Sequence, residues 1–246
     1  MIRNAHRVNL GQAPELKGNQ GDFFFLCRRD AQRAVSTVLE LCKTRLPENM
    51  HIPAEQIQVL TPTRKGPCGT ANLNRLLQEA LNPKAPGKRE ILWGERVFRV
   101  GDRIMQTRNN YDVVWQKADG TVGTGMFNGD VGRIVEIDQS GEWLALDFDG
   151  RTAPYSLEML SEIDLAYAQT VHKAQGSEYR CVVLAAMPSA PSLMVRGVLY
   201  TALTRARELL VMVGDDAAVC AMAANDRQQK RYSGLKWRLR HAGENG

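Results

Sequence analysis

The sequence predicts an α/β fold in which a small antiparallel β-barrel interrupts a domain built on a parallel sheet. Two changes in the hydrophobic pattern support this prediction. Apolar strand runs alternate with helical patterns over residues 22–82 and again after residue 160. Between these parts the runs are short, bounded by turns and rich in β-branched or aromatic residues, as in antiparallel strands. We therefore predict that residues 1–92 and 161–246 build the parallel-sheet domain and that residues 93–160 form the insert.

The first segment is expected to hold two strand–helix pairs. Phe23–Cys27 (FFFLC) and residues 57–60 (IQVL) are apolar runs of strand length. Asp30 can cap a first helix, and Thr70 can cap a second helix that stops at Asn82, directly before a proline. Strands that alternate with helices in this way predict a parallel sheet with crossover helices.

The insert is expected to consist of short strands joined by tight turns. The strand candidates are residues 97–100, 103–107, 132–137 and 143–148. The dipeptides Asn128-Gly129, Gly101-Asp102 and Asp149-Gly150 are typical of turns between such strands. Residues 111–125, which contain several glycines, are expected to form a hairpin tip or a loop.

The parallel pattern returns after residue 160. Residues 163–168, 181–186 and 209–213 are strand candidates, and residues 193–206 and 216–223 are helical. The insert therefore separates two parts of one domain that must pair in space.

Composition argues against a membrane-spanning or secreted protein and is weakly in favour of a nucleic-acid partner. The 246 residues carry 32 Lys+Arg against 27 Asp+Glu, a net charge of +5, which fits a nucleic-acid partner without demanding one. Part of this excess lies in a basic C-terminal tail that is either a solvated face or a DNA contact. No apolar run is long enough for a membrane span, and no signal-peptide core follows Met1, so a cytoplasmic protein is expected. The five scattered cysteines show no metal-ligand spacing, and no metal site is predicted.

The predicted helix at 193–207 carries the first candidate for chemistry. Thr201 and Arg205 lie one turn apart, on the side opposite the apolar face of this helix. An arginine fixed in this way can stabilise negative charge on a transferring phosphoryl group. Alternatively, Arg205 is a surface arginine that pairs with a carboxylate such as Glu208.

The second candidate follows the strand predicted to end near residue 168. Thr170, His172 and Lys173 supply three hydrogen-bond donors suited to phosphate oxygens. Gly176 allows close approach of the backbone to a ligand, and Glu178 can accept a hydrogen bond from a ribose hydroxyl. A lone histidine is more often structural, but the density of polar groups here favours a ligand site.

The third candidate is the loop at 61–69 (TPTRKGPCG), which follows the second strand. Thr61, Thr63, Arg64 and Lys65 precede a helix N-terminus, where free N–H groups favour anions. All three clusters are expected at the carboxyl ends of strands in one sheet, where parallel sheets place their ligands.

Several long segments, in order, resemble the C-terminal half of the RecD-like helicases of superfamily 1, which move 5′ to 3′ on single-stranded DNA. The matching segments are NAHRVNLGQAP at 4–14, VLTPTRKGPCGTANLNRLLQEALNP at 59–83, VFRVGDRIMQTRNNYD at 97–112, FNGDVGRI at 127–134, AYAQTVHKAQGSEY at 166–179 and YTALTRARELLVMVG at 200–214. The resemblance implies a second RecA-like motor domain with an inserted Src-homology-3-like barrel.

The resemblance also implies roles for individual residues. TVHKAQG is similar to helicase motif V and LYTALTRAR to motif VI, which makes Arg205 the finger on the γ-phosphate of ATP. The other implied nucleotide contacts are Gln175, Gly176, Glu178, Thr201 and Arg207, with Tyr200 as a further support. The implied contacts with single-stranded DNA are Thr61, Thr63, Arg64, Thr170, His172 and Lys173.

The resemblance does not extend to the phosphate-binding loop. The sequence contains no GxxxxGK[ST] motif, which in the family belongs, with the Mg²⁺-binding acidic pair, to a first motor domain. We therefore expect ATP with Mg²⁺ to bind at a site shared with an N-terminal motor domain, in the same chain or a separate one, and no turnover by this chain alone. A non-catalytic module that binds nucleic acid or docks a partner is the alternative, and a barrel that binds protein is a third possibility.

Overall fold

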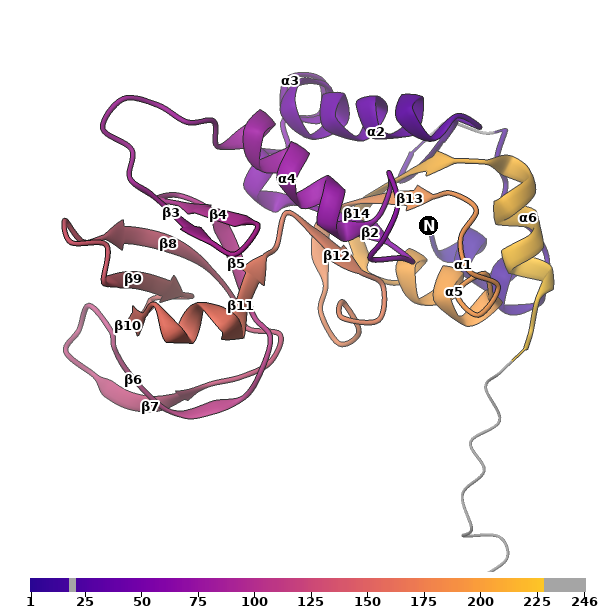
Figure 1. The fold of residues 1–246 in the computed structure, drawn as a ribbon. Coiled ribbons are helices and arrows are strands. Elements are labelled where there is room, and N and C mark those ends of the chain that lie inside the picture. The colour runs from indigo at the N-terminus through magenta and orange to yellow at the C-terminus, as the bar shows by residue number, and fades with distance from the viewer. Residues whose placement is uncertain (18–20, 228–246) are drawn as a thin grey trace, which may run out of the picture.

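The computed structural model describes residues 1–17 and 21–227 and contains two parts, a parallel-sheet domain and an antiparallel β-domain beside it (Figure 1). Of the predicted basic tail, Arg227 is the last described residue. Its other basic residues, Lys230, Arg231, Lys236, Arg238 and Arg240, lie outside the described residues. Within the described part of the chain, no helix is long and apolar enough to cross a membrane.

The parallel sheet draws its strands from both sides of the insert. Its order is β1 (Phe23–Cys27), β14 (Ala206–Gly214), β13 (Tyr179–Ala186), β2 (Ile57–Thr61) and β12 (Ala168–Thr170). Every neighbouring pair is parallel. The predicted α/β class and the pairing of the two separated parts are thus confirmed.

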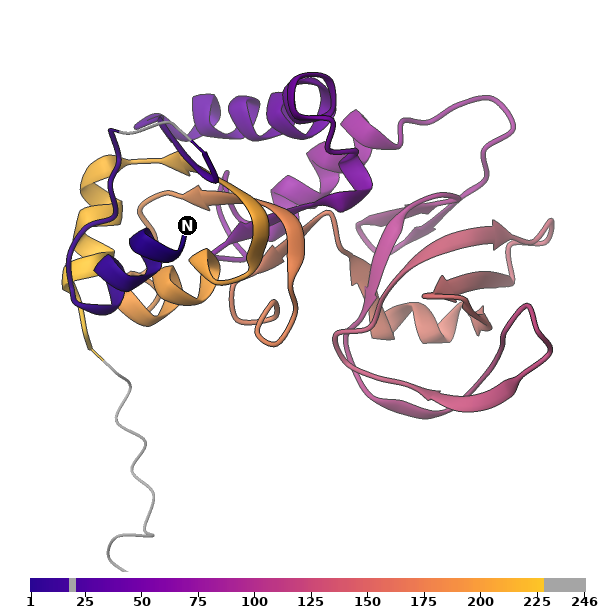
Figure 2. The same ribbon diagram turned by 180° about the vertical axis from the view of Figure 1, so that it is seen from behind.

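Helices cover both faces of this sheet (Figure 2). One face carries α2 (Ala31–Glu40), which continues through a π-helical turn at Leu41–Arg45 into α3 (Leu46–Met50), and α4 (Thr70–Leu81). The other carries α1 (Ile2–Asn9), α5 (Arg196–Leu203) and α6 (Asp216–Ala224). Side chains of β13 alternate between the two layers: Val183 packs on the first face and Val182 on the second, as strand geometry requires.

The two predicted helix caps differ in outcome. The Asp30 carboxylate accepts a hydrogen bond from the Arg33 main-chain N–H at 2.8 Å, which confirms the first cap. Thr70 is the first residue of α4, and the N-cap is Gly69, so the second cap was predicted wrongly. The Thr70 N–H donates instead to the carbonyl of Thr63, which ties the helix to the loop before it.

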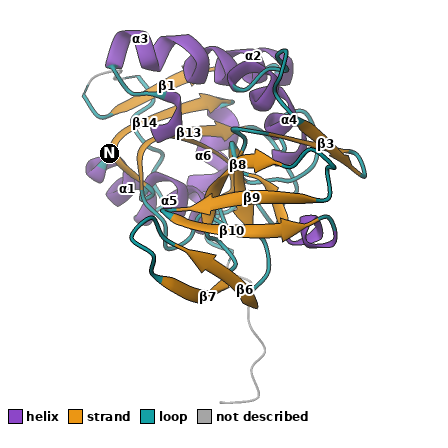
Figure 3. Ribbon diagram, turned by 90° about the vertical axis from the view of Figure 1, so that its left-hand side faces the viewer, coloured by secondary structure: helices purple, strands orange, loops and turns teal. Residues whose placement is uncertain are grey.

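The insert forms a two-stranded hairpin and a seven-stranded antiparallel sheet that faces the viewer in Figure 3. The hairpin is β3 (Glu90–Trp93) with β4 (Arg96–Arg99). The sheet order is β11 (Ile163–Leu165), β5 (Arg103–Gln106), β8 (Val131–Ile137), β9 (Trp143–Phe148), β10 (Arg151–Ser156), β6 (Asn110–Gln116) and β7 (Val122–Met126). At the β9–β10 turn Asp149 and Gly150 both have positive φ, at 55° and 78°, as a two-residue hairpin of the predicted kind requires.

Two strand predictions need correction. Residues 111–125 belong to a hairpin, as one of the two expectations had it, but they are more than its tip: most of them lie in β6 and β7, where a Cβ on Gly123 would overlap the Trp115 ring. The run at 163–168 is not one strand: β11 pairs antiparallel with β5, and β12 pairs parallel with β2. The chain changes sheets at Ala166, whose carbonyl accepts a hydrogen bond from the buried Gln58 side chain.

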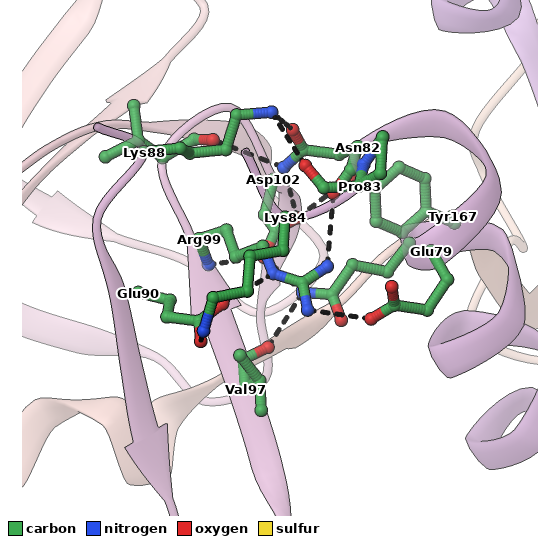
Figure 4. A network of polar contacts seen from close by, with 12 residues as sticks. Glu79, Asn82, Pro83, Lys84, Lys88, Glu90, Val97, Arg99, Asp102 and Tyr167 are labelled. Carbon is green, nitrogen blue, oxygen red and sulfur yellow. Dashed lines mark hydrogen bonds and ion pairs between the residues drawn. The ribbon is translucent and has the colours of Figure 1, made fainter. Parts of the chain in front are cut away.

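A buried polar cluster joins α4 to the antiparallel domain, and we call it the Asp102 network (Figure 4). One carboxylate oxygen of Asp102 accepts from Gln78 Nε2 at 2.5 Å and from the Arg99 main-chain N–H at 2.6 Å. The other accepts from Asn82 Nδ2 at 2.7 Å and from the Tyr167 hydroxyl at 2.9 Å. Burial raises the pKa of Asp102 above its ordinary value, although these hydrogen bonds lower it.

Arg99 extends the Asp102 network. Its guanidinium contacts Glu90 at 2.9 Å, Glu79 at 2.7 Å and the carbonyl oxygen of Asn82 at 3.2 Å. Because Glu79 and Asn82 flank the end of α4 while Glu90 lies in β3, the guanidinium fixes the hairpin on the helix. The antiparallel domain is therefore held to the parallel-sheet domain by directional bonds as well as by apolar packing.

Candidate functional site

The predicted site residues lie at two opposite edges of the parallel sheet. Thr61 and Thr170 end β2 and β12 at the carboxyl edge, whereas Glu178 and Arg205 directly precede β13 and β14 at the amino edge. The prediction that all three clusters share the carboxyl edge is therefore wrong. The reason is that residues 171–178 cross from the end of β12 to the start of β13.

At the carboxyl edge the two polar loops are joined through Thr61. Thr61 and Thr170 are register partners, and the Val171 N–H donates to the Thr61 carbonyl at 3.0 Å. Thr61 is only 1% exposed, and its hydroxyl oxygen accepts from the Thr63 N–H at 3.4 Å. Its side chain therefore shapes the loop from inside, while Arg64 and Lys173 are exposed on the surface.

The loop at 61–69 is packed tightly against the start of α4. The Ala71 N–H donates to the Arg64 carbonyl at 3.3 Å. A Cβ on Gly69 would lie 2.5 Å from the Lys65 carbonyl oxygen and 2.6 Å from that of Arg64. Because backbone rather than a flexible side chain fills this space, only glycine fits at residue 69.

The close packing around Gly69 predicts that a larger residue at this position lowers the stability of the fold. Gly69→Ala is expected to destabilise the chain by about 1–3 kcal/mol, the usual cost of forcing extra atoms into a packed region. Chemical denaturation measures the change. Gly197→Ala is the matched control, because a Cβ at Gly197 in α5 meets no atom within 4 Å. The control should be neutral or slightly stabilising; equal effects of the two substitutions would contradict the packing argument.

A cleft of about 1000 Å³ lies between the loop at 61–69, α4 and the antiparallel domain. Its basic lining residues are Arg64, Arg75, Arg96 and Lys173, and its acidic ones are Glu79, Glu95 and Asp164. Burial lowers the pKa of Lys173, as does the charge of Arg64, while Asp164 raises it. The cleft thus brings together four cations from two loops, α4 and β4, beside three carboxylates, of which Asp164 lies 3.5 Å from Arg96.

Sequence reasoning missed three contributors to this cleft. Arg75 and Arg96 line it, and the buried Asn74 side chain bonds to main-chain atoms of Leu165 and Ala168, where the chain passes between sheets. The one available signal was Asn74 on the apolar face of a predicted helix, beside Leu73. Arg75 and Arg96 had no local signal, because their place in the cleft depends on packing.

A second cavity, of about 540 Å³, is lined by His172 but not by Lys173, the next residue in the sequence. His172 and Gln175 line it together with Tyr200 and Thr201 of α5, whereas Lys173 lines the larger cleft. The structure therefore brings His172 to the residues predicted to face nucleotide. Gly176, with φ +88°, and the exposed Glu178 lie on the same crossover segment.

Arg205 is not on the helix as predicted, because α5 ends at Leu203. Its guanidinium is instead held in the following turn by three hydrogen bonds. Nε donates to the Thr201 carbonyl at 3.2 Å, Nη1 to the Ser177 carbonyl at 2.9 Å, and Nη2 to the Thr204 hydroxyl at 3.1 Å. The Arg205 guanidinium thus links the segment 170–178, which is similar to helicase motif V, to the segment 200–207, which is similar to motif VI.

Glu208, the carboxylate suggested as an alternative partner of Arg205, pairs with a different arginine. Glu208 pairs with Arg180 at 2.7 Å, and Arg205 forms no salt bridge with any residue in the described ranges. Its charge is therefore fixed in position but not neutralised by a carboxylate. Arg207, the second residue of β14, is exposed to solvent.

Comparison with protein families matches both parts of the chain. Residues 73–148 match the SH3 domain of ATP-dependent RecD-like DNA helicases, and residues 165–213 match the UvrD-like helicase C-terminal domain. The ATP-dependent RecD2 DNA helicase of Deinococcus radiodurans is 37% identical over 184 residues, which cover 75% of this chain. The chain belongs to the RecD-like helicases.

Other relatives agree with this assignment. The RecBCD enzyme subunit RecD of Mycolicibacterium smegmatis is 33% identical over 77% of the RecD-like chain. The chain spans about a quarter of the length of these relatives, 23% of the Deinococcus protein and 30% of the Mycolicibacterium protein.

Solved structures match the fold. Two crystal structures of Pif1 helicase from Bacteroides, one in complex with ADP-AlF3 and ssDNA and one bound to ssDNA, each superpose with a TM-score of 0.50 and 15% identity. Each match covers 99% of the RecD-like chain and 54% of the Pif1 chain. The arrangement of a RecA-like sheet with an SH3-like insert is therefore shared with these helicases.

Proposed function

We propose that this RecD-like chain is the second motor domain of an ATP-dependent DNA helicase. In this proposal it binds single-stranded DNA and supplies Arg205 to an ATP site completed by an N-terminal motor domain. That other domain would hold the phosphate-binding loop and Mg²⁺, as the family resemblance implies. The chain's own contribution is one charged wall of the site.

The observation that carries this proposal is the fixed but unpaired charge of Arg205. A guanidinium has five N–H donors, and three are directed to protein oxygens at 2.9–3.2 Å. The remaining donors and the whole positive charge stay available to an anion. Since the three bonds fix the group before any ligand arrives, a phosphoryl group would meet a preorganised cation.

The cleft at the carboxyl edge supports the DNA part of the proposal. Arg64 and Lys173 come from two loops and line one groove. Thr63 and Thr170 belong to the same loops, and the Thr170 hydroxyl accepts a hydrogen bond from the Lys173 N–H at 3.3 Å. Contacts of this kind go to phosphates, which makes binding independent of base sequence and sensitive to salt. The Pif1 structures named above hold ssDNA on a chain of the same fold.

Lys173→Ala tests the DNA face. We expect weaker binding of an oligo-dT probe and a reduction of about 0.7 in the slope of log K against log salt, which corresponds to one lost phosphate contact. Fluorescence anisotropy at several salt concentrations measures both. Lys43→Ala, which changes an exposed lysine of the π-helical turn, is the control and should keep the slope. An unaltered slope in Lys173→Ala would remove this residue from the DNA face.

ATP hydrolysis separates the helicase proposal from a non-catalytic module. The chain alone should bind DNA without turnover, and turnover should appear when an N-terminal motor domain completes the site. If the complete protein binds DNA but hydrolyses no ATP, the chain is a binding module that keeps the helicase fold. Turnover by the chain alone would contradict the shared site.

A further inference from the structure

Two arginines of the antiparallel domain lie directly opposite each other. Arg103 in β5 and Arg133 in β8 are register partners, so their side chains leave the sheet on the same face. Both line a cavity of about 250 Å³, together with Glu55, Asn82 and Tyr167. Like charges directly across a strand pair destabilise a sheet, so this pair requires an explanation.

Protein groups satisfy Arg103 only in part. Its Nη1 donates to the main-chain carbonyls of Ile57 at 3.1 Å and Glu55 at 3.4 Å. It forms no salt bridge within residues 1–17 and 21–227, although most of its surface is buried. Burial lowers the pKa of Arg103, and the neighbouring charge of Arg133 acts in the same direction. A largely buried cation without a carboxylate is costly.

Arg133 is better solvated and only weakly paired. Its guanidinium lies 3.8 Å from the Glu55 carboxylate, with half of each side chain exposed, at 49% and 56%. An exposed pair at this distance contributes little and can separate at small cost. Arg133 can therefore turn toward a ligand that also contacts Arg103.

We propose that Arg103 and Arg133 bind a small oxyanion, with inorganic phosphate as the ligand. Two guanidinium groups on one side of a polar cavity provide paired N–H donors and a charge that a tetrahedral oxyanion matches. The cavity is smaller than typical pockets for nucleotide-sized ligands, so a single phosphate fits better than a nucleotide. Apolar side chains of Ile57 and Leu77 form part of its wall and strengthen the electrostatic attraction.

The location separates this site from the DNA cleft. Glu55 and Ile57 lie at the amino edge of the parallel sheet, whereas the cleft with Lys173 opens at the carboxyl edge. The cavity lies where the antiparallel domain meets the first residues of β2. Bound phosphate would therefore stabilise the contact between the two parts of the chain.

Thermal unfolding in phosphate-free buffer, with and without added phosphate, tests the proposal. Sodium chloride keeps the ionic strength equal in both arms. Phosphate at about ten times its Kd should raise Tm by about 3 °C. Arg133→Ala, at a half-exposed position, should abolish the rise, and Glu55→Gln should enlarge it because it removes the competing carboxylate. Arg108→Ala, an exposed arginine outside the cavity, is the control and should respond like the unmodified chain.

The outcomes are distinct. Equal Tm values in phosphate and chloride, or a full response in Arg133→Ala, would overturn the site. A second arm uses oligo-dT: stabilisation by oligo-dT that depends on Arg133, with none from free phosphate, would assign these arginines to a nucleic-acid backbone and reject the free ion. Neither arm involves ATP turnover, so the site can fail while the helicase proposal stands.

Discussion

Replacing Arg205 by alanine in a complete helicase that carries this chain is expected to lower ATP turnover by about 10³-fold or more, the usual effect of losing an arginine finger. Binding of single-stranded DNA should remain near normal, because the cleft at the carboxyl edge does not include Arg205. The physical reason is that alanine removes a cation held by the Thr201 and Ser177 carbonyls. Steady-state hydrolysis with saturating DNA measures the effect.

Two variants show whether the effect belongs to the finger role. Arg205→Lys keeps the charge but cannot reproduce three fixed donors, so it should recover only part of the activity. Arg180→Ala removes a nearby arginine that is already paired with Glu208 and should keep most of the turnover. Because Arg205 also joins two segments, the Tm of each variant is measured in parallel. Near-normal turnover in a folded Arg205→Ala protein would refute the proposed role.

Asp102→Ala is expected to produce the largest loss of stability, about 3–5 kcal/mol, the range for removing one partner from a buried charged network. Four donors converge on this fully buried carboxylate, from Gln78, Asn82, Tyr167 and the Arg99 main chain. Without it the Tyr167 hydroxyl and the Arg99 N–H lose this acceptor in the interior, and the amides of Gln78 and Asn82 keep only the carbonyls of Val97 and Val100. The free energy of unfolding from urea titration measures the loss.

The loss of unfolding free energy should be smaller when a substitution at residue 102 keeps an oxygen that accepts hydrogen bonds. Asp102→Asn keeps one oxygen and nearly the same shape, so it should lose less than Asp102→Ala. Asp112→Ala is the matched control, because Asp112 is exposed on β6 and its carboxylate forms no hydrogen bond or salt bridge with the residues that the structure describes. If Asp102→Ala were no more destabilising than this control, the network would not be what holds the antiparallel domain on α4.

The local elements of the parallel-sheet domain follow from residue type and spacing. Phe23–Cys27 forms β1 as predicted, because a short apolar run that is buried on one face and partly buried on the other packs well in a parallel sheet between helices. The Asp30 cap was predictable for the same kind of reason, since a cap depends on atoms within four residues. The motif-like segments around Lys173 and Arg205 were likewise visible from residue type and spacing alone.

Local pattern does not show which of those residues lie close together in the folded chain. Lys173 follows β12 at the carboxyl edge, whereas Arg205 lies at the amino edge because α5 returns the chain there after β13, and local pattern does not record this reversal. His172 and Lys173 line different cavities for the same reason. The opposition of Arg103 and Arg133 depends on strand register, which long-range pairing sets. The residue types that can bind a ligand are therefore visible in the local sequence. The distances between them depend on packing between segments far apart in the chain.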